Sequence, residues 1–67
     1  MKVKELLDRT LGMTKVKFFS YNAEKGENDF MSSTRTCGEW RERGSHADKD
    51  VKSIDIYAYS GVMLIEI

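Results

Sequence analysis

Residues 51–67, VKSIDIYAYSGVMLIEI, decide the fold, because two strands and the turn between them can be read directly from them. Polar and apolar residues alternate from Val51 to Tyr59, as in a strand with one buried and one exposed face. Ser60-Gly61 suits a tight hairpin turn. Val62 to Ile67 is apolar on both faces but for one glutamate, which is typical of a central or covered strand. The sequence therefore predicts a C-terminal hairpin whose last strand has cover on both sides.

At the other end of the chain, apolar residues at helical spacing predict an amphipathic helix over about residues 2 to 11. The stripe consists of Val3, Leu6, Leu7, Thr10 and Leu11. Gly12 follows where a C-cap glycine belongs. Because so short a helix is marginal in isolation, we expect its stripe to pack on a sheet.

The segments between these ends supply the rest of the predicted sheet. Thr14 to Tyr21 alternates as a first strand, and the polar stretch Asn22 to Asn28 suits a hairpin loop. Asp29 to Cys37 alternates as a strand with a solvated face, and we expect Glu39 to Arg43 to extend it or to form another short strand. Gly44 to Asp50 is a polar turn region.

These elements predict one α+β domain over residues 1–67. We expect an N-terminal helix packed on an antiparallel sheet of four or five strands, either open or curled into a small barrel. A chain of 67 residues has a small core, which leaves self-association through the apolar final strand as an open alternative.

Composition excludes several classes of function. Lys plus Arg and Asp plus Glu number 11 each, which argues against a strongly basic nucleic-acid binder. No segment is long and apolar enough to span a membrane, and an apolar leader is interrupted by Asp8 and Arg9. One unpaired cysteine fits a reducing compartment. We therefore expect a cytoplasmic protein.

Neither catalysis nor a cofactor is predicted. Cys37 and His46 are the only cysteine and histidine, and a structural zinc site needs four ligands in a recognised spacing. The same two residues lack the third, orienting group that a nucleophile and base require. We interpret Cys37 as a half-buried strand residue and His46 as a solvated loop residue. No metal site, no cofactor and no enzyme activity are expected.

The first candidate contact surface is the stretch that carries the only tryptophan. Its members are Arg35, Trp40, Arg41 and Arg43, and Trp and Arg are enriched at binding hot spots. The competing interpretation is that Trp40 fills the core while the charged residues form a solvated face. A buried Trp40 indole would favour that structural role.

A second candidate surface combines basic and aromatic residues of two predicted strands. Its members are Lys15, Lys17, Phe19, Tyr21 and Tyr57. Such a sheet face is a common way to bind single-stranded nucleic acid. The neutral overall charge gives no electrostatic attraction, so nucleic acid is the alternative and not the favoured partner.

Both ends of the chain resemble small proteins encoded by phages, prophages and mobile elements of Gram-positive bacteria. The resemblance rests on Lys4 to Leu7, Thr14 to Phe18, Val51 to Tyr57 and Gly61 to Ile67. It does not cover residues 31–50 and transfers no functional residue. It implies an inhibitor of host defence, such as an anti-CRISPR protein, that binds and blocks a host protein complex.

Overall fold

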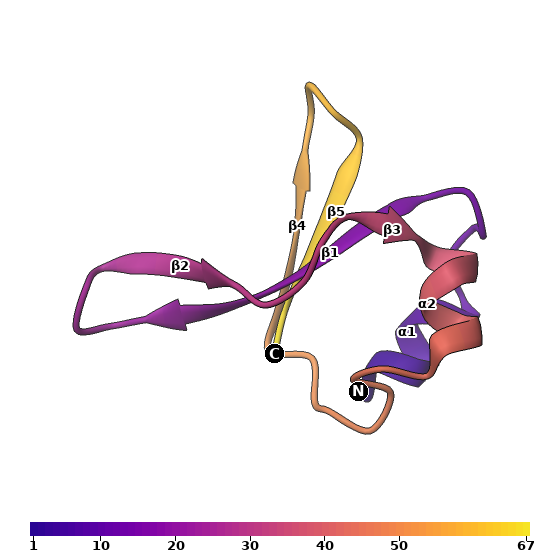
Figure 1. The fold of residues 1–67 in the computed structure, drawn as a ribbon, viewed down its shortest axis with the longest axis horizontal. Helices are drawn as coiled ribbons and strands as arrows, with labels where there is room; N and C mark the ends of the chain where they lie inside the picture. Colours follow the sequence, from indigo (N-terminus) through magenta and orange to yellow (C-terminus); the bar gives the residue numbers. More distant parts are fainter.

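The sheet is organised around strand β1 (Lys15–Asn22) in the computed structural model, which describes all residues from 1 to 67. Strand β1 pairs antiparallel with β2 (Glu27–Phe30) and β3 (Arg35–Thr36), and parallel with β5 (Val62–Glu66). Strand β4 (Ser53–Tyr57) pairs antiparallel with β5. The resulting order β2-β1-β5-β4, with β3 beside β1, is a mixed sheet of five strands that does not close into a barrel (Figure 1).

The predicted α+β class is confirmed, while the pairing within the sheet differs from the prediction in one respect. The sheet is not wholly antiparallel, because β1 and β5 run parallel. Parallel neighbours need a long connection, and here the chain between β1 and β5 provides it. The predicted C-terminal hairpin is present, and its last strand is central as expected. Both edges of β5 are paired within the chain, so β5 offers no free edge for strand pairing with a second copy, and self-association stays a prediction.

Helix α1 (Val3–Asp8) is shorter than predicted. Arg9 and not Gly12 is the C-cap, and the Thr10 hydroxyl donates to the carbonyl oxygen of Leu6 at 2.8 Å, which helps to close the last turn. The N–H groups of Val3 and Lys4 donate to carbonyls of residues 49 and 47, so the turn region satisfies donors at the start of the helix. Leu11 lies outside the helix and is exposed, contrary to the predicted stripe.

A second helix, α2 (Cys37–Arg43), replaces the strand that we predicted over Glu39 to Arg43. The Thr36 hydroxyl accepts a hydrogen bond from the Glu39 N–H, and the Glu39 carboxylate accepts one from the Thr36 N–H. This reciprocal pair is a capping box. Gly44 ends the helix with φ of 66°, a left-handed conformation that costs glycine little.

The predicted strand over Asp29 to Cys37 is broken in its middle. The Ser32 hydroxyl accepts the N–H of Phe18 at 3.0 Å, where a regular ladder would use a backbone carbonyl. The Met31 N–H still donates to the Phe18 carbonyl oxygen at 2.9 Å, and the chain then leaves the ladder and returns as the short strand β3 before it enters α2.

Both helices pack on one face of the sheet, which we call the helix-bearing face. It carries Val16 and Phe18 of β1 and Met63 and Ile65 of β5, and these join the core cluster with Val3, Leu7, Cys37 and Trp40. The opposite face bears no helix. We call it the open face; its residues on β1 and β5 are Lys15, Lys17, Phe19, Tyr21, Val62, Leu64 and Glu66.

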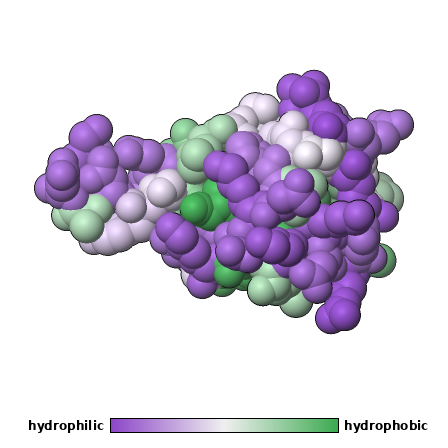
Figure 2. All heavy atoms as spheres, turned by 90° about the horizontal axis from the view of Figure 1, so that it is seen from below, coloured by the Kyte–Doolittle hydropathy of each residue, from purple (hydrophilic) through white to green (hydrophobic).

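The molecule measures 33 × 28 × 18 Å along its principal axes, and two hairpins project from it. Figure 1 shows the β1–β2 hairpin extending away from the helices and the β4–β5 hairpin rising at a steep angle to it. Figure 2 shows that the projecting β1–β2 end is mainly hydrophilic, with hydrophobic surface where it meets the body. The structure thus exposes strand surface far from its helices.

Candidate binding surface

Trp40, the centre of the first predicted surface, is a core residue. Its side chain is buried, with 5% exposure, and its Nε1 donates to the carbonyl oxygen of Val16 at 3.0 Å. The indole meets the Phe18 ring edge-on, with 4.9 Å between centroids and an interplanar angle of 79°. Trp40 therefore offers almost no side-chain surface to a partner, which is the arrangement expected of its structural role.

The three arginines of that surface do not converge on one spot. Arg41 donates from Nη2 to the carbonyl oxygen of Thr10 at 3.0 Å and so braces the chain that follows α1. Arg35 and Arg43 instead lie near Glu39, and Arg35 Nη1 is 3.7 Å from Glu39 Oε2. Hydrogen bonds from Thr36, and then the charges of the two arginines, lower the pKa of Glu39. Glu39 thus caps α2, and Arg41 links α2 to the chain after α1.

The members of the second predicted surface do share a face. Strand β5 separates β1 from β4, yet the register places Lys15, Val62 and Tyr57 in one row, and Lys17, Leu64 and Asp55 in the next. Because cross-strand neighbours point to the same side of a sheet, Tyr57 joins Lys15, Lys17, Phe19 and Tyr21 on the open face. The face is continuous over β1, β5 and β4.

The open face carries several aromatic side chains, which differ in exposure. Tyr21 and Tyr57 are about half exposed, whereas Phe19 is buried although no helix covers this side of the sheet. Phe30, which we did not predict to belong here, lies opposite Phe19 and is also about half exposed. A hairpin centred on the predicted Asn22 to Asn28 loop would place Phe30 opposite Ser20, so the observed pairing with Phe19 is shifted by one residue and could not be predicted from that loop.

The charges of the open face balance. Lys15 and Lys17 of β1 share the face with Glu66 of β5 and Asp55 of β4, and only Lys17 and Asp55 lie in the same row. The Lys17 ammonium lies 4.1 Å from the centroid of the Phe30 ring, a cation–π contact. Glu66 accepts a hydrogen bond from the Ser53 hydroxyl at 2.8 Å. The face therefore combines exposed aromatic rings with isolated charges of both signs.

Cys37 and His46 each have partners in or beside the core. Cys37 is fully buried at the start of α2, and its thiol donates to the carbonyl oxygen of Leu7 at 3.3 Å. The His46 ring lies 4.9 Å from that of Phe18. Burial, and then the charge of Lys49, lower the pKa of His46. Our interpretation of a half-buried cysteine on a strand and a solvated histidine is corrected by these contacts. No three His, Cys, Asp or Glu side chains converge as metal ligands would.

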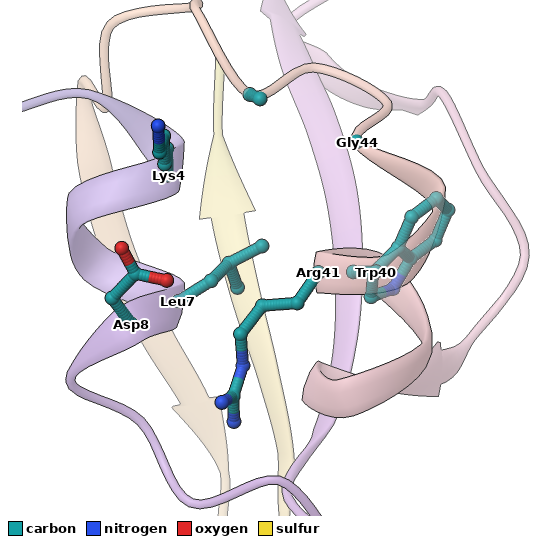
Figure 3. Close-up of a pocket in the computed structure, with 7 residues that line it drawn as sticks. Lys4, Leu7, Asp8, Trp40, Arg41 and Gly44 are labelled. Carbon is teal, nitrogen blue, oxygen red and sulfur yellow. The ribbon is translucent and has the colours of Figure 1, made fainter.

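A groove of about 260 Å³ lies between the two helices. Figure 3 shows Lys4, Leu7 and Asp8 of α1 on one side of it and Trp40 and Arg41 of α2 on the other. Its volume is below the range of about 300–1,000 Å³ that is usual for small-molecule sites.

Fold and surface together define a small α+β domain whose sheet is covered by helices on one side and open on the other. No helix of the structure has the length and apolar character needed to cross a membrane. The sequence matches no family model, no curated protein and no solved structure.

Proposed function

We propose that this protein is a non-enzymatic binding protein that docks the open face of its sheet on another protein. The observation that carries the proposal is that half-exposed Tyr21, Phe30 and Tyr57 all lie on a face without helices. Large aromatic side chains are enriched in the centres of protein interfaces, where they contribute most of the binding energy. The proposed contact thus moves from α2, where Trp40 is buried, to the sheet.

The balance of charge favours a protein partner over nucleic acid. Two lysines and two carboxylates share the face, so it lacks the positive field that draws a phosphate backbone. Isolated charges around aromatic residues are instead what the rim of a protein interface requires, because they select a partner by complementarity.

The resemblance to accessory proteins of phages supports a particular kind of partner. On this proposal the partner is a host protein complex, such as a CRISPR–Cas or other defence nuclease in the host cytoplasm. Binding would block the complex by occupying its surface. No catalytic step or cofactor is involved.

The test compares capture of one partner by two matched variants. Tyr21→Ala with Tyr57→Ala removes two exposed rings from the open face, whereas Tyr59→Ala removes a fully exposed ring from the turn after β4. We expect the double variant to lose a partner that wild type and Tyr59→Ala both retain. Equal retention by all three proteins, with unchanged circular dichroism, would contradict the proposal.

Single-stranded nucleic acid is the second candidate for the same face. The observation in its favour is Lys17 above the Phe30 ring, because a cation beside an exposed ring can contact a phosphate while the ring stacks on a base. This function predicts a mobility shift of a labelled single strand at low salt that weakens as salt rises. Lys17→Ala should reduce the shift, and absence of any shift at low salt excludes this candidate.

A further inference from the structure

Strand β4 is an edge strand with almost no tertiary support. It contacts no helix or strand other than β5. Its free edge is bounded on one side by the N-terminus, where the N–H of Val51 donates to the carbonyl oxygen of Met1 and Lys2 pairs with Asp50. On the other side the turn over residues 58–61 closes the hairpin. Residues 53–57 therefore form a short open edge.

The side chains of this edge differ between the two faces of the sheet. Ile54 and Ile56 are opposite Ile65 and Met63 and so point to the helix-bearing face, but the helices do not reach them. They are 46% and 63% exposed. Asp55, which lies between these two residues in the sequence, points to the open face. An exposed edge with two large apolar residues is suited to pairing with another strand.

A second copy of this chain fits the edge poorly. The antiparallel register that uses the whole free segment 53–57 is centred on Asp55 and places two Asp55 carboxylates opposite each other. Like charges in directly opposed positions destabilise a strand pair. Asp55 also accepts the N–H of Ile56 at 2.8 Å, so its carboxylate occupies a backbone donor of the strand. The opposed carboxylates disfavour self-pairing and leave a negative charge to be matched by a different strand.

We propose that the β4 edge takes up an extended segment of the partner protein in which a lysine or arginine faces Asp55. On either side of that cation, apolar β-branched residues would face Ile54 and Ile56. A carbonyl of the incoming strand would replace the Asp55 carboxylate at the Ile56 N–H, which frees the carboxylate to pair with the cation. The inference rests on the proposed function, since it presumes a protein partner, and it names the segment that β4 recognises.

Synthetic peptides test this directly. The probe is a capped Thr-Thr-Val-Lys-Val-Thr-Thr peptide. The control peptide has the same sequence with Glu in place of Lys. Titration is followed by amide chemical shifts of 15N-labelled protein. We expect shifts centred on residues 53–57 and at least threefold tighter binding of the Lys peptide. Equal binding of both peptides, or shifts elsewhere, would overturn the inference.

A charge reversal completes the experiment. Asp55→Lys should prefer the Glu peptide, whereas Asp48→Lys, an equal change in the exposed 44–50 turn, should keep the preference for Lys. Asp55→Asn, a milder substitution, should abolish the preference without reversing it, and circular dichroism verifies each fold. An unchanged preference in folded Asp55→Lys and Asp55→Asn also overturns the inference. If β4 binds neither peptide while the open-face tyrosines remain necessary for partner capture, only the edge inference fails.

Discussion

Trp40 and Val16 are joined by a hydrogen bond of 3.0 Å between the indole Nε1 and a backbone carbonyl oxygen of β1. The bond fixes α2 against the strand around which the sheet is organised. It also explains why the most conspicuous residue of the sequence does not lie on the proposed binding surface.

Trp40→Phe should therefore lower stability but spare binding. The substitution leaves the Val16 carbonyl without its partner, and an unpaired buried polar group costs about 1–3 kcal/mol of the free energy of unfolding. Urea unfolding measures the loss, with Tyr59→Phe as an exposed control. The folded fraction should capture its partner as wild type does. If folded Trp40→Phe no longer captures the partner, the binding surface lies on α2 and not on the open face.

The capping box predicts a second loss of stability. Thr36→Ala removes the hydroxyl that accepts the Glu39 N–H, and loss of such a cap costs about 0.5–2 kcal/mol. Thr34→Ala, on an exposed residue before β3, is the matched control. If urea unfolding gives equal values for the two variants, α2 does not depend on this cap.

Much of the scaffold could be predicted because its signals are local. Alternation located β1, β4 and β5 to within about two residues of their observed bounds. The parallel pairing of β1 with β5 could not be predicted in this way, since nothing local in either strand records which distant segment lies beside it. Residues 15, 17, 19, 21 and 57 were expected to share a face, and they do although β5 lies between the two strands.

The second helix was missed although its signals were present. Thr36 and Glu39 have capping-box spacing, and Gly44 follows at the C-terminal end. The serines and threonines from Ser32 to Thr36 made the segment resemble a continuous strand. The side chain of Ser32 is what breaks that strand, and a tertiary hydrogen bond of this kind leaves no periodic trace in the sequence.

His46 makes stability depend on pH. Burial lowers the pKa of His46 in the folded state, so the unfolded chain binds more protons below about pH 6.5. The stabilising contribution is present above that pH and is lost as pH falls toward the folded-state pKa. Urea unfolding from about pH 7 to about pH 5 should show this decline.

His46→Asn is the appropriate control for that titration. His46 has φ of 62°, a conformation that asparagine tolerates better than most residues. The variant should lack the decline between about pH 7 and about pH 5. The lowered pKa values of Glu39 and Asp50 act in a more acidic range and do not interfere. If the free energy of unfolding of His46→Asn declines over this range as it does in the wild type, another titrating group causes the decline.

The burial of Cys37 predicts slow chemistry at its thiol. A disulfide reagent should label native protein only as fast as the core opens, and should label it at once in denaturant. Absorbance of the released thiolate measures both rates. Immediate labelling in native buffer would contradict the packing of α2 against α1.

Site-specific photo-crosslinking shows which surface of the protein touches the partner. A photoreactive residue is placed at Lys15, Tyr21 or Tyr57 on the open face, and at Lys4 or Glu42 on the helices as matched controls. We expect the open-face positions to crosslink to one and the same protein and the helix positions not to crosslink. Crosslinks from the helix positions alone, or to nucleic acid in place of protein, would contradict the proposed function.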